Sequence, residues 1–145
     1  MAALLRRALR LGGLLYLDEY VGPSRDEWRL AHQLRWNWHY YHLPRSVRRV
    51  GRVRPPINLE DPTEAIASSR IRTAIRGEFE LLHERGYGGN LLSVIYPNLR
   101  RPSHDPPSPR ADFDAAVTRL LDEEDRVLGR GEQSYNAVIL ATPRR

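Results

Sequence analysis

Two long stretches rich in proline and arginine divide this chain and limit the folds that it can adopt. Residues 44–60 contain three prolines and five arginines, and residues 100–110 contain four prolines. Proline lacks a backbone N–H and fixes φ, so neither stretch can continue a helix or form a central strand. We therefore expect regular segments joined by long extended connections, which a compact monomer rarely needs.

Composition narrows the chemistry that is available. The chain has 145 residues, enough for one domain, but its mean hydropathy of −0.58 predicts a small core. Cysteine is absent, which excludes a thiol nucleophile, a disulfide and a cysteine-ligated metal or iron–sulfur site. All 23 basic residues are arginine, which excludes a P-loop lysine and a Schiff-base lysine. A GC-rich genome explains this usage, and selection for forked binding of carboxylates or phosphates is the alternative.

Hydrophobic periodicity predicts four helices and a short strand. The helices are expected over about residues 2–20, 25–43, 62–85 and 110–128, and the strand over about 135–141. The second helix presents an apolar face that consists of Trp28, Ala31, Leu34, Trp38 and Tyr41. The predicted fold is therefore mostly α-helical: a small bundle of about four helices with long extended connections and a short C-terminal strand.

Local signals set the expected ends of these segments. Ser24 and Glu27 are spaced as a capping box before the second helix, and Asp61 and Glu64 as another before the third. Gly86 has the position of a residue that ends the third helix. The organisation that follows is an arginine-rich N-terminal helix over 1–22, a helical core over 23–99, a proline-rich linker over 100–110, and a C-terminal amphipathic helix with its tail over 111–145. Residues 91–96 are expected to form a short strand or one helical turn.

The positive charge is concentrated in the first 58 residues, which carry 11 arginines against 4 acidic residues. The densest cluster follows four aromatic residues, and arginine beside tryptophan and tyrosine is typical of protein-interface hot spots and of nucleic-acid contacts. No RNP or GXXG pattern is present, which favours a protein interface over RNA. The predicted partner-binding residues are Trp36, Trp38, Tyr40, Tyr41, Arg45, Arg48, Arg49, Arg52 and Arg54.

No pattern in the sequence predicts catalysis, a cofactor or a metal site. His39 and His42 have a spacing that could share a metal, but no acidic residue lies between them, so packing at an interface is the preferred interpretation. The glycine-rich segment 86–90 lacks the Gly-Lys-Ser/Thr of a nucleotide-binding loop. The acidic run 122–125 is expected to lie on the solvated face of the last helix. We therefore expect a chain that is not an enzyme.

The N-terminal segment has the character of a mitochondrial targeting helix. It contains Arg6, Arg7 and Arg10 and has no acidic residue before Asp18. An apolar stripe is expected along Leu4, Ala8, Leu11 and Leu15. We expect this helix to stay uncleaved and to dock, and no apolar run reaches the length of a membrane span.

Two segments resemble those of the mitochondrial LYR-motif family of small three-helix proteins. Members carry a Leu-Tyr-Arg motif followed by a proline, and later an Ile/Val-Arg-x-x-Phe segment. Here residues 34–38 lead to Pro44, and residues 75–79 match the later segment, whereas Leu34-Arg35-Trp36 replaces the Leu-Tyr-Arg triplet. The resemblance implies an accessory subunit of respiratory complex I or an assembly adaptor, with acyl carrier protein as a partner.

Together these features predict a non-enzymatic accessory or structural subunit of a large respiratory-chain assembly, peripheral to the mitochondrial inner membrane. It would bind neighbouring subunits and anionic lipid headgroups. One alternative is a mitochondrial ribosomal protein whose arginine cluster binds rRNA, and another is a peripheral subunit of the mitochondrial ATP synthase.

Overall fold

The computed structural model describes residues 2–10, 12–55, 65–102 and 110–144, which form two compact units. Each unit is built from segments that are distant in the sequence. Unit one contains residues 1–26, 63–87 and 133–145, and unit two contains residues 27–62 and 88–132. These units cut across the segments 23–99 and 111–145 that the sequence predicts, because neither unit is continuous along the chain.

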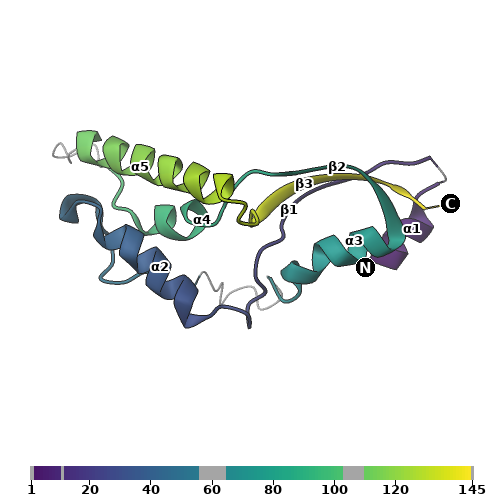
Figure 1. The fold of residues 1–145 in the computed structure, drawn as a ribbon, viewed down its shortest axis with the longest axis horizontal. Helices are drawn as coiled ribbons and strands as arrows, with labels where there is room; N and C mark the ends of the chain where they lie inside the picture. The colour runs from purple at the N-terminus through teal and green to yellow at the C-terminus, as the bar shows by residue number, and fades with distance from the viewer. Residues whose placement is uncertain (1, 11, 56–64, 103–109, 145) are drawn as a thin grey trace. The chain divides into compact units, whose positions relative to one another are not determined.

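Unit one is a three-stranded antiparallel sheet with helices on one face (Figure 1). Its elements are α1 (Ala2–Ala8), β1 (Leu15–Tyr20), α3 (Ile71–Glu78), β2 (Phe79–Gly86) and β3 (Asn136–Pro143). The strand order is β1-β3-β2, so that β3 is central. Alternate residues of β3, at 137, 139 and 141, are buried in a core with residues of α1 and α3. The sheet thus buries one face, as the period of two in a strand requires.

The described residues form five α-helices and this sheet, so the prediction of a mostly α-helical fold is wrong: the protein is mixed α and β. Residues 15–20 were expected in the first helix and residues 79–86 in the third, but they form β1 and β2. Both pair with β3, whose buried alternate residues need strand neighbours on each side. Helix propensity is a weak preference that such tertiary pairing overrides.

Two local predictions in unit one change with these strands. Gly86 ends a strand rather than a helix, at a point where an added Cβ would lie 2.4 Å from the Cβ of Ser134. In α1 the residues that pack on the core are Ala2 and Leu5, followed by Leu9, whereas Leu4 of the predicted stripe is 68% exposed. Leu4 and Ala8 were thus placed one residue away from the buried face, whereas Leu15 is buried in the core as part of β1 and Leu11 lies outside the described residues.

Unit two is helical in its described part. It contains α2 (Leu30–Tyr41), a 3₁₀ turn at Arg45–Val47, α4 (Leu92–Ile95), a second 3₁₀ turn at Tyr96–Asn98 and α5 (Arg110–Gly129). The prediction of the last helix is confirmed, and 91–96 takes its helical alternative. Trp36, Tyr40, Leu91, Ile95 and Leu120 are among the side chains that form one core. None of the described helices is long and apolar enough to cross a membrane.

The predicted start of α2 is wrong. The helix begins at Leu30 rather than near residue 25, and the His32 imidazole accepts the Arg29 N–H, 3.1 Å between nitrogens. Ser24 instead belongs to unit one, where its hydroxyl lies 2.9 Å from that of Ser69. The predicted cap at Asp61–Glu64 and most of the proline-rich linker, residues 103–109, lie outside the described residues.

Glu124 is a buried residue of α5, contrary to the expectation that residues 122–125 are all solvated. Its carboxylate accepts the backbone N–H groups of Asn90 and Leu91, both at 2.7 Å, and of Leu92 at 3.2 Å. The loop comes so close that a Cβ at Gly88, where φ is +105°, would lie 2.8 Å from the carboxylate. Glu124 therefore fixes the loop that begins α4, and a charged acceptor at a helix start is favourable.

We expect Glu124→Gln to lower the free energy of unfolding of unit two by about 2–4 kcal/mol, because one carboxylate acceptor becomes an amide donor facing buried N–H groups. Urea unfolding followed by tryptophan fluorescence measures this, since all three tryptophans lie in unit two. Glu123→Gln is the matched control. Glu123 bonds Arg126 near the surface, so its loss should cost less than about 1 kcal/mol. Equal losses in both variants would contradict the role given to Glu124.

Candidate functional site

The candidate site lies in unit two, where α2 holds the backbone of the arginine-rich segment 45–54. The Asn37 amide donates to the Val53 carbonyl and accepts the Val53 N–H, both at 2.9 Å. The Tyr40 hydroxyl donates to the Val50 carbonyl at 2.9 Å, and the Tyr41 hydroxyl donates to the carbonyl of Gly51 at 2.8 Å. Three side chains on one side of a helix therefore fix a segment that has no helical or strand ladder of its own over 50–53.

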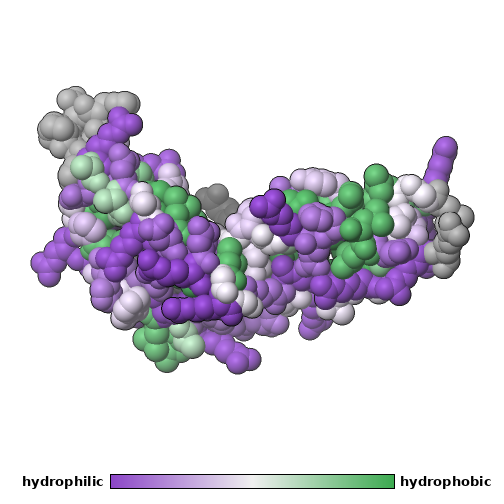
Figure 2. Space-filling view, turned by 45° about the horizontal axis from the view of Figure 1, so that its top comes forward, coloured by the Kyte–Doolittle hydropathy of each residue, from purple (hydrophilic) through white to green (hydrophobic). Residues whose placement is uncertain are grey.

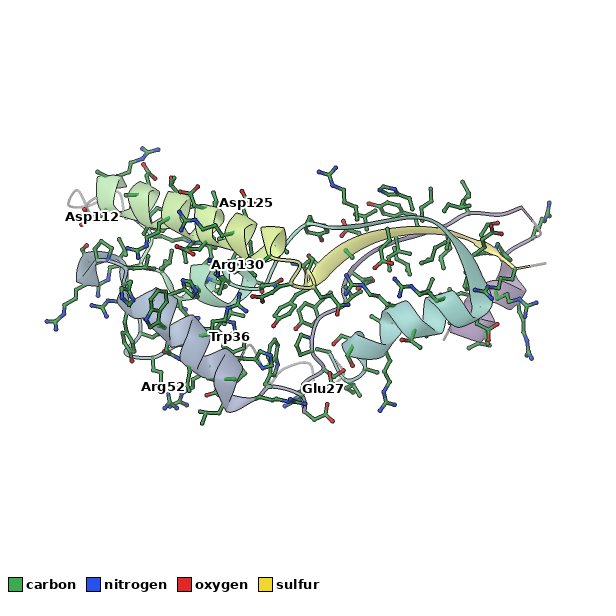
Figure 3. The ribbon with its side chains drawn as sticks, viewed as in Figure 1. Glu27, Trp36, Arg52, Asp112, Asp125 and Arg130 are labelled. Carbon is green, nitrogen blue, oxygen red and sulfur yellow. The ribbon has the colours of Figure 1, made fainter. Side chains whose placement is uncertain are left out.

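The valines and arginines of this segment face opposite ways. Val47 and Val53 are buried in the core of unit two and Val50 packs against it. The arginine side chains are directed outward, with Arg48 half-buried and the others exposed, as Figure 3 illustrates for Arg52. Burial of the valines thus determines that the guanidinium groups reach the surface. We call the five residues the arginine segment: Arg45, Arg48, Arg49, Arg52 and Arg54.

No carboxylate among the described residues forms an ion pair with the arginine segment. The contacts of these arginines are with backbone and ring groups: Arg49 donates to the Pro97 carbonyl at 2.8 Å, and the Arg48 guanidinium lies 5.7 Å from the centroid of the Tyr41 ring. Cation–π contacts leave the positive charge in place. The segment therefore presents a concentrated positive charge to a partner.

An apolar ridge on α2 adjoins this charge. Four large hydrophobic side chains spaced four, four and three residues apart form one stripe on the helix, and 49–69% of each is exposed. We call them the α2 ridge: Leu30, Leu34, Trp38 and Tyr41. Tyr41 belongs to the ridge and also holds the backbone of the arginine segment, so the two surfaces are continuous.

The structure separates the four predicted aromatic residues into two pairs. Trp38 and Tyr41 are on the exposed ridge, whereas Trp36 and Tyr40 are fully buried, with the Trp36 indole N–H donating to the Asn90 carbonyl at 3.0 Å. The prediction that Trp36 and Tyr40 form partner-binding surface is corrected, because their side chains fill the core. Leu34, Trp38 and Tyr41 of the predicted apolar face are exposed, because α2 has large apolar side chains on two sides and Trp36 and Tyr40 are the ones that enter the core.

A groove of about 660 Å³ opens beside the arginine segment. Arg52 and Arg54 line one part of it, and Ser93, Pro97 and Asn98 line another. Its volume is within the range of small-ligand sites, and its lining combines the apolar side chains of Val50, Pro55, Val94 and Pro97 with the guanidinium groups of Arg52 and Arg54. It extends the positively charged surface.

Two histidines of α2 have lowered pKa values. Burial lowers the pKa of His39 from 6.5; Glu123 opposes this, and nearby arginines add to it. Burial and then Arg29 lower the pKa of His32. His42 contacts the Trp38 carbonyl at 2.7 Å, and the described residues contain no group of three or more metal-ligating side chains.

Comparison with protein-family models, with curated proteins and with solved structures found no match to this chain. The LYR-family resemblance therefore stays a prediction. Of its two segments, residues 34–38 lie in α2 of unit two, and residues 75–79 span the end of α3 and the first residue of β2 in unit one.

Sequence reasoning missed Asn37, the residue that fixes the arginine segment at Val53. A signal was present, because residues 36, 37 and 40 share one side of the helix, next to the stripe that was chosen. A buried asparagine needs backbone partners, and the adjoining segment supplies them.

We expect Tyr40→Phe to destabilise unit two by about 1.5–3 kcal/mol, because it removes the acceptor of the Val50 N–H and leaves buried groups without a partner. Tyr41→Phe removes the same atom at an exposed bond and should cost about 0.5 kcal/mol. Urea unfolding and amide exchange at Val50 measure both. Similar losses, or unchanged exchange in Tyr40→Phe, would show that the hydroxyl does not hold the segment.

We also expect unit two to lose stability as the pH falls through 6.5, because the unfolded chain then binds protons that the folded chain, with its lowered pKa values at His32 and His39, does not. Replacing both residues by glutamine should flatten this dependence. The measurement is the urea concentration at the midpoint of unfolding, taken above and below pH 6.5. His83→Gln in unit one is the control. A double variant that keeps the wild-type slope would refute the assignment.

Proposed function

We propose that this protein is a non-enzymatic docking subunit, and that the α2 ridge and the arginine segment bind an acidic, partly apolar surface of another protein in a larger assembly. The observation that carries the proposal is their adjacency: four exposed hydrophobic side chains lie beside five arginines that no described carboxylate neutralises.

The ridge supplies the binding free energy in this proposal. Fully burying a large apolar side chain is worth about 1.5–3 kcal/mol, and interface hot spots are enriched in tryptophan, tyrosine and arginine. Trp38 and Tyr41 have exposed rings of this kind, with Arg48 beside Tyr41. Because the buried side of α2 is fixed in the core, the ridge is rigid before binding and little order has to be gained.

The arginine segment supplies selectivity. Residues 27–55 carry seven arginines and one acidic residue, Glu27, a net charge of +6. Such a field speeds the approach of an acidic partner and disfavours basic ones. Anchoring through Asn37 and Tyr40 holds the backbone between the arginines in one conformation, which suits forked guanidinium–carboxylate contacts.

The cellular setting belongs to the same proposal. The arginine-rich, acid-poor N-terminal segment supports a mitochondrial location beside the inner membrane, where a respiratory-chain assembly of the complex I type or the ATP synthase would supply the neighbouring subunits. rRNA and anionic lipid headgroups are the competing partners for the arginine segment, since both offer phosphate.

We expect a photo-crosslinking residue at Trp38 to capture a discrete acidic protein in cells, whereas the same residue at Leu121, which is 48% exposed on α5, should not. Arg49→Glu with Arg52→Glu should abolish the crosslink, and Arg119→Glu on α5 with Arg130→Glu just after this helix should leave it. Native gels and mass spectrometry of the crosslinked species are the measurements. A chain that purifies as a folded monomer with no crosslinked protein would refute the proposal.

The RNA alternative is distinguished by filter binding at two salt concentrations. A phosphate-dominated complex loses affinity steeply with salt and depends little on Trp38. We expect purified RNA and anionic vesicles to bind no more tightly to the wild type than to Trp38→Ser. Binding of RNA in the nanomolar range that the double arginine variant abolishes would replace the protein partner by a nucleic acid.

A further inference from the structure

The two outer strands of the unit-one sheet differ in how they are protected from further pairing. In the order β1-β3-β2, both β1 and β2 have one neighbour among the strands that the structure describes. β2 is irregular, with a bulge between Leu81 and His83, and it carries the charged residues Glu80, Glu84 and Arg85. Bulges and charges are the means by which proteins keep an edge strand from pairing with another chain.

β1 has neither a bulge nor a proline or glycine. All six of its residues pair with β3 in one unbroken register, from Leu15 opposite Ala141 to Tyr20 opposite Asn136. Its first three residues are large and apolar, and it contains no lysine or arginine. A regular edge strand of this composition is a template for an added strand.

On the sheet face that carries Tyr16, large apolar side chains reach the surface. Tyr16 is 63% exposed and lies opposite Leu140 of β3, which is only partly buried, as is Val138. On the other face the alternating residues of β3 are buried with the helices. Figure 2 shows hydrophobic side chains gathered on the surface of this unit. An added strand would therefore gain backbone pairing, with its side chains alternating between the face of Tyr16 and the face that the helices cover.

The charge of β1 indicates which strand would fit. Its two charged residues, Asp18 and Glu19, are both acidic and both exposed. The Tyr87 hydroxyl donates to Asp18 at 2.6 Å, and this hydrogen bond raises the pKa of Tyr87 to about 12. A second copy of β1 could pair antiparallel with the first, with Asp18 opposite Asp18 and the helices of both copies on one side of the sheet. This register sets like charges opposite each other, which is destabilising.

We propose that the outer edge of β1 binds an extended segment of a partner polypeptide that alternates aliphatic residues with basic ones. Its basic side chains lie opposite Tyr16 and Asp18 on the exposed face, and its aliphatic side chains lie opposite Leu15 and Leu17 on the face that the helices cover. The added strand makes the sheet four-stranded and covers Tyr16. This inference does not rest on the proposed function, because it concerns a different unit and a different set of residues.

A synthetic peptide of alternating valine and arginine tests the inference on the full chain. We expect it to bind and to slow amide exchange of β1 by about tenfold or more, without slowing exchange in β2. The same peptide N-methylated at every amide cannot donate backbone hydrogen bonds, and a valine–glutamate peptide has the wrong charge, so neither should protect β1. Equal binding of the N-methylated peptide would reduce the interaction to general electrostatics and overturn the proposal.

Two matched variants locate the surface. Tyr16→Lys on β1 should weaken binding of the valine–arginine peptide by about tenfold, and Leu82→Lys on β2, at a similarly exposed residue, by less than about twofold. Circular dichroism verifies that each variant folds. Absence of peptide binding, protection at β2, or a dimer in light scattering that Tyr16→Lys abolishes would each overturn the proposal, the last by assigning the edge to a second copy of the chain.

Discussion

The hydrogen bonds from α2 to the backbone of residues 50–53 are the interaction on which the surface of unit two depends. A helix with large apolar side chains on two sides can bury only one of them in a small unit. Asn37 and Tyr40 decide which side, because they bind Val53 and Val50 and bring those valines into the core. Because this side of α2 is buried, Leu34 and Trp38 are exposed to solvent and the guanidinium groups of the arginine segment lie on the surface. The candidate site is thus a direct consequence of which side of α2 packs in the core.

Part of the fold could be predicted from the sequence because it is locally determined. α5 has a long amphipathic repeat, and β3 has a short apolar run bounded by polar residues, so both were found close to their actual limits. β1 and β2 were mistaken for helix because leucine, glutamate and arginine are good helix formers. Their strand state is set by β3, whose residue Ala137 lies opposite both Glu19 and Gly86 although it is more than 50 positions later. No local pattern contains that pairing.

The charge of the candidate site could be predicted from the sequence, but the set of aromatic side chains exposed beside that charge could not. The count of arginines between 45 and 54, and their alternation with valine, already placed positive charge on the surface. Which aromatic rings accompany it depends on the rotation of α2 about its axis, and that rotation is fixed by contacts with Asn90 and Asn98, over 50 residues away. The same limit applies to Glu124. Its spacing to Leu120 and Val127 indicates the buried stripe of α5, but its acidic neighbours favoured the prediction of a solvated run.

The close approach of Glu124 to Gly88 has an evolutionary consequence. A Cβ at position 88 would crowd the Glu124 carboxylate, and this carboxylate holds the loop together with the Trp36 indole and the Ser93 hydroxyl. Substitution of either residue alone is unfavourable. A Cβ at position 88 requires a shorter side chain at position 124, and a shorter side chain there loses the hydrogen bonds to the three backbone N–H groups. In descendants of this sequence the two sites should be retained or lost as a pair, which makes their joint presence a sensitive marker of common ancestry.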